Sequence, residues 1–185
     1  VDTIIRRGEF ATAYTPYQAE VSQGTLQAIF EYQSLVCDLT GMEVANASHY
    51  DGATATAEAV IQAYNVFRKK RRKILISPTV HPHYREVVRT YTQGMDLTVS
   101  GDASLETTLE DLVAQVDGET ACVIVQSPNF LGQIDNLDGL ADAIHAQDKR
   151  TLLVVATNPI SLGLLKPPGA YGADIVVGDG QPLGL

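Results

Sequence analysis

The sequence predicts an α/β fold of three layers, in which helices cover both faces of a doubly wound, mainly parallel sheet. Short apolar runs alternate along the chain with segments whose apolar residues recur at helical spacing. The runs are continuously apolar, which is typical of strands buried on both faces. Helices of this length between strands indicate right-handed crossovers and therefore parallel pairing.

The chain opens with a segment that does not share this alternation. Residues 1–21 are polar and aromatic without a regular period, and we expect an irregular arm and interface segment there. The first long helix is expected over residues 22–40, where apolar residues repeat at helical spacing and Gly41 ends the helix. We therefore predict an arm, 1–21, followed by the α/β body, 22–185.

Strands and helices then follow one another through the body. An extended piece at 43–47 leads into a helix expected from Thr54 to Arg68, and Ser104 or Asp102 is expected to cap a later helix. Ligands of such sheets bind beyond the carboxyl ends of the strands. The remaining elements are expected as helices at 84–91, 105–116 and 137–146 and as strands at 74–76, 97–99, 121–125, 152–155 and 175–177.

A turn of small residues at 46–59 begins one of these helices. Gly52 permits a tight turn, and Ala53 and Thr54 leave the first N–H groups of the helix uncovered. Those groups carry partial positive charge, so a phosphate or a carboxylate would fit there. The alternative is an ordinary helix start that Asp51 or Thr54 caps.

The charge balance argues against two classes of partner. The chain of 185 residues has a net charge of -9, which disfavours nucleic acid and anionic membranes. The basic run 68–73 is a local exception that suits the carboxyl end of a helix. A nucleic-acid patch or a nuclear signal is the alternative reading of this run.

Cysteine and histidine usage points to a cytoplasmic protein without a bound metal. Cys37 and Cys122 lie in apolar stretches without CxxC spacing, so we expect buried free thiols. The four histidines do not have the spacing of a metal site. The sequence contains neither an apolar run of membrane-spanning length nor an opening signal peptide.

The loops that follow the predicted strands carry His, Asn, Thr and Gln. They contain neither a lysine nor a serine paired with a base, which are the usual activated nucleophiles. Asp179 is the one acid at these strand ends, and no base stands beside it in the sequence. Each of these residues taken alone is a common turn former.

Several short motifs resemble the glycine decarboxylase P-protein family. The similarity extends from about residue 7 to 185, and is closest to the N-terminal half, subunit 1 of the two-subunit enzymes. We expect the chain to be a central part of such a subunit, because it lacks an initiator methionine and stops within a Gly/Pro turn. The motifs are TAYTPYQAE at 12–20, SQG at 22–24, FEYQ at 30–33, NAS at 46–48, YDGA at 50–53, TVHP at 79–82, PNFLG at 128–132, NP at 158–159, LKPPGAYGADI at 165–175 and GDGQ at 178–181.

The resemblance implies the large domain of the aspartate-aminotransferase fold, which pyridoxal-phosphate enzymes share. It implies glycine dehydrogenase (decarboxylating) activity, in which glycine loses CO2 and its aminomethyl group passes to the lipoyl arm of H-protein. Pyridoxal phosphate supplies the difficult carbanion chemistry. The implied partners are subunit 2, H-protein and glycine, in an assembly expected to be a heterotetramer.

A cofactor site of this family needs an anion-binding helix start, a stacked ring, an acid at the pyridinium nitrogen and a lysine. The resemblance assigns the helix start to Asp51, Gly52, Ala53 and Thr54, and the ring to His81, as a weak or vestigial site.

The acid and the lysine are missing from their expected places. Ala156 or Thr157 stands where the acid is expected, and Gln181 stands where the lysine is expected. Lys166 precedes the last strand in a Pro-Pro-Gly turn, and we reject it as a substitute. We therefore assign no catalytic residue to this chain.

The missing groups imply a supporting role. Pyridoxal phosphate is expected on subunit 2 and not covalently on this chain, which would complete the partner's site. Tyr14 and Tyr17 in the arm are the candidate contributors to that site.

Two alternatives remain open from the sequence. One is a stand-alone pyridoxal-phosphate enzyme, an aminotransferase or a lyase, whose lysine lies beyond Leu185. The other is a doubly wound domain that binds a nucleotide, although no GxGxxG or GxxxxGK[ST] motif follows a strand.

Overall fold

A computed structural model describes residues 1–11 and 23–184 of the chain. The chain divides into two compact units, Val1–Ser48 and His49–Leu185. The predicted boundary between residues 21 and 22 falls among residues that the structure does not describe, so it stays a prediction.

The first unit is helical. It contains α1 (Asp2–Ile5), α2 (Gly8–Ala11) and the long α3 (Gln23–Thr40). The expected long helix is confirmed, and Gly41 ends it at a φ of 72°, donating its N–H to the Cys37 carbonyl at 2.9 Å. The prediction of an irregular arm is wrong at 2–5 and 8–11, because helices of one turn are too short to produce a repeating apolar pattern.

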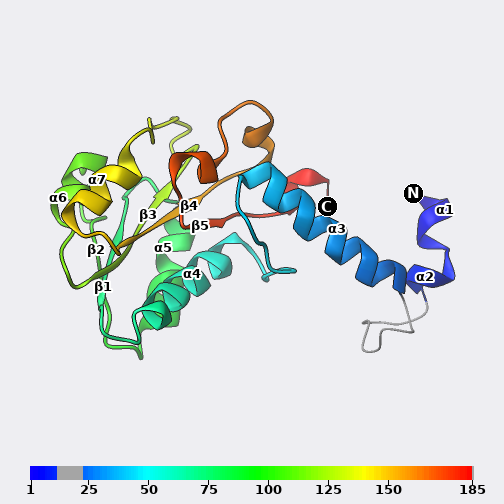
Figure 1. The fold of residues 1–185 in the computed structure, drawn as a ribbon, viewed down its shortest axis with the longest axis horizontal. Helices are drawn as coiled ribbons and strands as arrows, with labels where there is room; N and C mark the ends of the chain where they lie inside the picture. Colours follow the sequence, from blue (N-terminus) through cyan, green and yellow to red (C-terminus); the bar gives the residue numbers. More distant parts are fainter. Residues whose placement is uncertain (12–22, 185) are drawn as a thin grey trace. The chain divides into compact units, whose positions relative to one another are not determined.

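A parallel sheet of five strands forms the centre of the second unit (Figure 1). The strand order is β2-β1-β3-β4-β5, and each pair of neighbours is parallel. The predicted parallel α/β fold is therefore confirmed. The strands are β1 (Lys73–Ile76), β2 (Thr98–Ser100), β3 (Thr120–Gln126), β4 (Leu152–Ala156) and β5 (Ile175–Val177).

Helices cover both faces of this sheet. Figure 1 shows α4 and α5 on one side and α6 and α7 on the other. Three short 3-10 helices, which the sequence analysis did not predict, follow the last two strands. The helices are α4 (Gly52–Val66), α5 (Pro82–Thr92), α6 (Leu109–Ala114), α7 (Leu140–Gln147), η1 (Pro159–Gly163), η2 (Pro168–Tyr171) and η3 (Gln181–Leu183).

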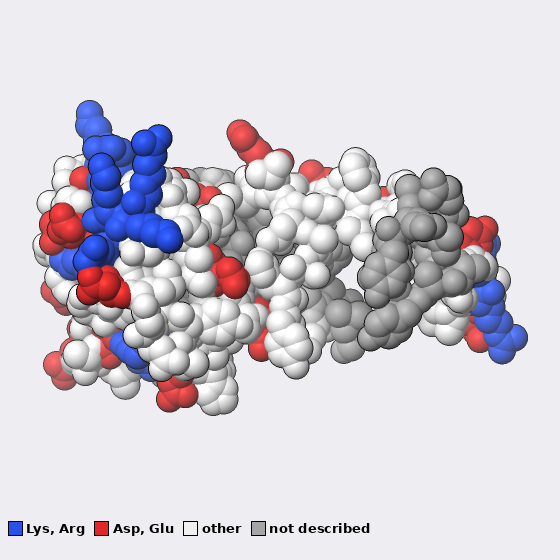
Figure 2. All heavy atoms as spheres, turned by 90° about the horizontal axis from the view of Figure 1, so that it is seen from below, with Lys and Arg blue, Asp and Glu red and all other residues white. Residues whose placement is uncertain are grey.

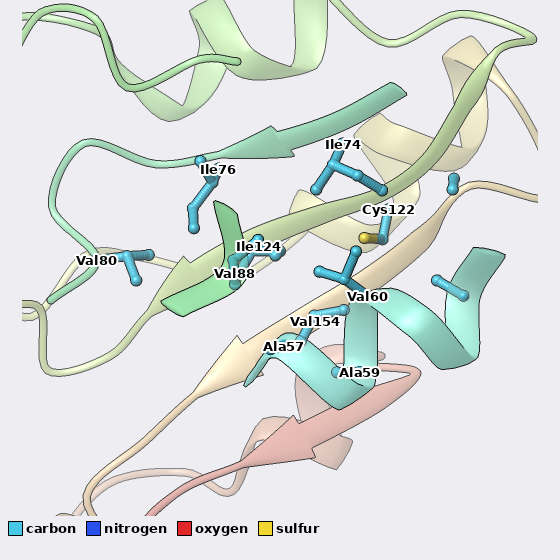
Figure 3. Packing of buried hydrophobic residues seen from close by; sticks show 12 residues of the cluster. Ala57, Ala59, Val60, Ile74, Ile76, Val80, Val88, Cys122, Ile124 and Val154 are labelled. Atoms are coloured by element: carbon cyan, nitrogen blue, oxygen red, sulfur yellow. The ribbon is translucent and has the colours of Figure 1, made fainter. Parts of the chain in front are cut away.

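Successive strand residues fill two separate cores. Ile74, Ile76 and Ile124 pack against α4 and α5 in one core, which Figure 3 shows from close by. Leu75 and Val123, which alternate with them, pack in the other core against α6 and α7. This alternation explains why the strands read as continuous apolar runs.

The residues of the extended piece expected at 43–47 form no strand in the described structure. One local expectation is wrong. Helix α6 begins later than expected, and Thr108 caps it through a reciprocal box with Asp111. Asp102 instead binds the guanidinium groups of Arg85 and Arg89, at 3.0 and 2.6 Å.

The basic run 68–73 lies where α4 passes into β1. Figure 2 shows Lys and Arg side chains gathered on one part of the surface. Arg71 is buried and pairs with Asp148 at 2.8 Å, while Arg72 pairs with Asp96 and Lys73 with Asp117. Three of the six basic residues therefore form ion pairs with acids elsewhere in this chain.

Candidate functional site

The residues singled out by the sequence come together at the carboxyl ends of the strands. The loop after β1 carries His81, β3 ends at Gln126, and the loop after β5 carries Asp179. The N–H of His81 donates to Gln126 Oε1 at 2.8 Å, and the N–H of Gly52 at the start of α4 donates to Asp179. We call this region the mouth of the sheet.

The start of α4 is capped by a reciprocal pair of side chains, Asp51 and Thr54. Asp51 Oδ1 accepts the N–H of Thr54 at 2.7 Å, and the Thr54 hydroxyl accepts the N–H of Asp51 at 3.0 Å. These hydrogen bonds from the backbone and side chain of Thr54 lower the pKa of the Asp51 carboxyl. Of the two caps considered for an ordinary helix start, Asp51 or Thr54, Asp51 is confirmed as the N-cap.

The anion at this helix start belongs to the chain itself. Asp179 Oδ1 accepts the N–H of Gly52 at 2.7 Å, and Asp179 Oδ2 accepts the hydroxyl of Tyr84 at 2.6 Å. A Cβ atom on Gly52 would collide with the Tyr84 hydroxyl and would lie 2.8 Å from Asp179 Oδ2. The glycine is therefore required by close packing of these two side chains.

Tyr84 remains a hydrogen-bond donor in this arrangement. Burial and the hydrogen bond to Asp179 raise the pKa of the Tyr84 hydroxyl far above its usual range. A hydroxyl that does not ionise at neutral pH cannot act as a base there. Its contact with Asp179 joins α5 to the loop after β5.

His81 is enclosed by aromatic rings. Its ring centroid lies 4.7 Å from that of Phe130, edge to face, and 5.3 Å from that of Tyr84. The N–H of His83 donates to His81 Nδ1 at 3.1 Å. Burial and the neighbouring His83 lower the pKa of His81, so its imidazole is neutral at neutral pH.

Buried Asn129 shapes the loop that carries Phe130. Its Oδ1 accepts the N–H groups of Leu131 and Gln133, each at 3.0 Å, and its Nδ2 donates to Asp135 at 3.0 Å. The N–H of Phe130 donates to the carbonyl of Thr79 at 2.8 Å. These bonds fix the loop after β3 against the loop after β1.

The places expected for the acid and the lysine contain neither group. Thr157 Oγ1 donates to the carbonyl of Ser127 at 2.8 Å, which joins the ends of β3 and β4. A Cβ on Gly178 would collide with the Thr157 carbonyl, so the end of β5 lies directly beside it. Gln181 is exposed in η3. Lys166 pairs with Asp138 at 2.8 Å, and its ammonium lies over the Tyr171 ring.

These residues do not fit pyridoxal phosphate. The start of α4 already binds a carboxylate, no lysine is present at the mouth in the described part of the chain, and Thr157 cannot hold a proton on the pyridine nitrogen. Of the predicted site residues, Gly52 and His81 are connected through Tyr84 and Asp179. Tyr14 and Tyr17 lie outside the described residues.

Tyr84 and the role of Asp179 were missed by the sequence analysis. The sequence contained one signal for Asp179. It is the one acid in the loops after the predicted strands, and the small-residue turn at 46–59 is expected at the same edge of the sheet. Its partner could not be identified, because Gly52 precedes it by 127 residues.

Other features of the described residues do not add a second centre. A shallow hollow of about 250 Å³ is lined by residues of α5, of β2 and of the turn that joins them. A second, of about 300 Å³, lies between α6 and α7, and neither is lined by residues of the mouth. Residues 1–11 and 23–184 contain no group of His, Cys, Asp and Glu placed to hold a metal. Within the same ranges, no helix is long and apolar enough to span a membrane.

The two cysteines are free thiols in different surroundings. Cys122 is buried in β3, and burial raises the pKa of its thiol to about 12. Such a thiol is unreactive at neutral pH. Cys37 in α3 is only half-buried, so the expectation that both are buried is wrong for Cys37.

Comparison with known proteins gives consistent similarities. The family described as "Glycine cleavage system P-protein" matches residues 1–185. The chain is 56% identical over 188 residues to a probable glycine dehydrogenase (decarboxylating) subunit 1 of Geobacillus kaustophilus (strain HTA426), and 55% identical over 190 residues to that of Carboxydothermus hydrogenoformans. Each alignment covers 100% of this chain and 41% of the relative, so the chain spans less than half of their length.

Solved structures agree with these relatives. A crystal structure of glycine decarboxylase (P-protein) of the glycine cleavage system, in inhibitor-bound form, matches with a TM-score of 0.85 and 49% identity. It covers 100% of this chain and 41% of that chain. A cystathione gamma lyase from Micromonospora echinospora matches with a TM-score of 0.61 at 16% identity over 94% of this chain and 44% of its own, which indicates a shared fold alone.

Proposed function

Because the chain belongs to the glycine cleavage system P-protein family, we propose that it is part of subunit 1 of a two-subunit glycine dehydrogenase (decarboxylating). The complete enzyme would decarboxylate glycine and pass the aminomethyl group to the lipoyl arm of H-protein. Support comes from relatives at 53–56% identity that carry the name of this subunit.

One observation supports the proposal that subunit 2, and not this chain, holds the cofactor: the chain's own groups fill the mouth of the sheet. A carboxylate of the chain fills the helix start, and Gln181 and Thr157 stand where a lysine and an acid are expected. Pyridoxal phosphate would therefore be held by subunit 2, where it supplies the electron sink for loss of CO2. This chain would support that site without holding the cofactor covalently.

The predicted site residues take different roles in this proposal. Asp51, Gly52, Ala53, Thr54 and His81 are the remains of a cofactor mouth. In the structure, Asp51 and Thr54 cap a helix and His81 packs between aromatic rings. Tyr14 and Tyr17 remain the candidates for groups donated to the partner's site.

The compartment and the partners of the proposed enzyme follow from the same assignment to subunit 1. We expect a cytoplasmic assembly with subunit 2, in which H-protein docks through its lipoyl arm and neither nucleic acid nor membrane is a partner. The net charge of -9 supports the exclusion of polyanions. A free, half-buried Cys37 fits a reducing compartment.

The two alternatives have less support. A stand-alone pyridoxal-phosphate enzyme would need an open anion site at α4, where Asp179 is bound. A nucleotide-binding domain would likewise need a helix start free for phosphate, and α4 does not provide one.

Reconstitution tests the proposal. The full-length protein and a lysine-bearing partner subunit are purified separately, and release of CO2 from glycine is measured with lipoylated H-protein and pyridoxal phosphate. We expect activity from the mixture and only background from either protein alone. Full activity of this protein alone, or of the partner alone, would contradict the proposal.

A further inference from the structure

We propose that Asp179 is a built-in anion that occupies the start of α4 and closes the mouth of this chain to phosphate-bearing ligands. The inference rests on the proposed function, which takes this helix start to be filled, and deepens it by naming the excluded ligand class. Its test uses inorganic phosphate alone, so it can fail independently of any result with a partner subunit or with glycine.

The charges at the start of α4 support this inference. The helix has 15 residues, so its first N–H groups carry the partial positive charge of a long helix. Two carboxylates already satisfy that charge, since Asp51 accepts the N–H of Thr54 and Asp179 accepts the N–H of Gly52, each at 2.7 Å. A phosphate, which carries about -1.5 to -2 charges, would be repelled by both.

The available space leads to the same conclusion. Even one carbon atom placed on Gly52 would collide with the Tyr84 hydroxyl and approach Asp179 Oδ2 to 2.8 Å. The Gly52 N–H itself already donates to Asp179 Oδ1 at 2.7 Å, so a phosphate could reach it only after the carboxylate had left.

The carboxylate is held from a second side. The hydroxyl of Tyr84 donates to Asp179 Oδ2 at 2.6 Å, so both oxygens of the carboxylate are hydrogen-bonded. The backbone of the Asp179 loop also has little space beside it, because a Cβ placed on Gly178 would collide with the Thr157 carbonyl. Asp179 therefore connects α4, α5 and the end of β5.

Removal of the carboxylate tests the inference in the full-length protein, with inorganic phosphate as the probe. Asp179→Ala opens the helix start, and Asp179→Ser opens it while keeping a small acceptor for the Gly52 N–H. Asp138→Ala is the matched control, because it removes the same charge from an exposed pair with Lys166. Melting temperature is measured against phosphate at constant ionic strength.

The expected result is a phosphate response in the Asp179 variants alone. At ten times the dissociation constant of phosphate, Tm should rise by about 3 °C in either variant. The unsubstituted protein and Asp138→Ala should not respond. An equal rise in all four proteins, or no rise in folded Asp179 variants, would overturn the inference.

A second measurement does not require either variant to fold. Hydrogen exchange of the peptide that contains Gly52 is followed by mass spectrometry in the unsubstituted protein, with phosphate and with chloride at equal ionic strength. Identical exchange in both salts is expected if Asp179 keeps phosphate out. Phosphate-specific slowing of exchange at this peptide would show an open site and would overturn the inference.

Discussion

The hydroxyl of Tyr84 and the carboxylate of Asp179 form a 2.6 Å hydrogen bond, although 95 residues separate them in the sequence. The same carboxylate accepts the N–H of Gly52 at 2.7 Å. One acidic side chain therefore fixes the relative positions of two helices and the last strand. In this chain, the mouth of the sheet is stabilised by the chain's own groups.

Substitution of Gly52 by alanine tests how tightly this region is packed. Alanine is intrinsically better than glycine in a helix by about 1 kcal/mol, yet we expect Gly52→Ala to destabilise the protein by about 2 kcal/mol. The reason is that the added methyl group collides with Tyr84 and Asp179. Urea unfolding of Gly52→Ala in the native and the Tyr84→Ala backgrounds measures the coupling. If the loss were the same in both backgrounds, the collision would not be its cause.

Arg71 should be the most sensitive member of the basic run. Its buried guanidinium contacts Asp148 Oδ1 and the Thr120 carbonyl, each at 2.8 Å, and lies over the Phe67 ring. Arg71→Ala removes the cation that pairs with Asp148 and leaves the Thr120 carbonyl with the Thr151 hydroxyl as a donor, and we expect a loss of about 3 kcal/mol in unfolding free energy.

Lysine at this position should recover only part of the loss, because an ammonium lacks the planar fork of the guanidinium. Lys70→Ala is the control, since Lys70 is exposed in the same run and should change stability by less than about 0.5 kcal/mol. Equal effects of Arg71→Ala and Lys70→Ala in urea unfolding would contradict this reading.

Protonation of Asp102 should account for part of the stability that the protein loses in acid. Burial opposes its ionisation, but hydrogen bonds from Arg89 and Arg85 outweigh burial, so the net pKa of Asp102 is lowered. Because the pKa is lower in the folded protein, the ionised carboxylate stabilises the fold at pH values above the pKa of the unfolded chain, about 3.9. This contribution is lost as the pH falls through the pKa of Asp102 in the folded protein.

Asp102→Asn should therefore be less stable than the native protein at pH 7 by about 2 kcal/mol, and the difference should shrink below about pH 4. Urea unfolding across this pH range measures it. Asp96→Asn is the control, because Asp96 is exposed in its pair with Arg72 and should show little effect. A constant difference for Asp102→Asn at all pH values would rule out this source of acid sensitivity.

Restoring a lysine at position 181 should not by itself create a cofactor site. Gln181→Lys supplies an amine, but Asp179 still occupies the start of α4 and Thr157 offers no acid. Combined with Asp179→Ala, the lysine should trap about tenfold more pyridoxal phosphate on borohydride reduction, since one charge-assisted contact is worth about 1.5–3 kcal/mol. Equal trapping by Gln181→Lys with and without Asp179→Ala, measured by mass spectrometry, would contradict this expectation.

The sheet could be predicted from the sequence because its determinants are local. Ile74 to Ile76 and Ala121 to Val125 are apolar at every position, and burial on both faces requires that pattern in the structure. The cap at Asp51 could also be predicted, because its partner Thr54 is three residues away.

The internal anion could not be predicted in the same way. Its bonds join Asp179 to Gly52 and Tyr84 across 127 and 95 residues, and a local pattern contains no information about such pairs. The cap of α6 was misassigned because Asp102 binds two arginines from α5, again a tertiary contact.

The proposal that this chain does not hold the cofactor is tested most directly by borohydride reduction of the assembled subunits with pyridoxal phosphate, followed by peptide mapping. We expect the reduced adduct on a lysine of the partner subunit and on no lysine of this chain. Stoichiometric labelling of a lysine in this chain, Lys166 included, would contradict the proposal.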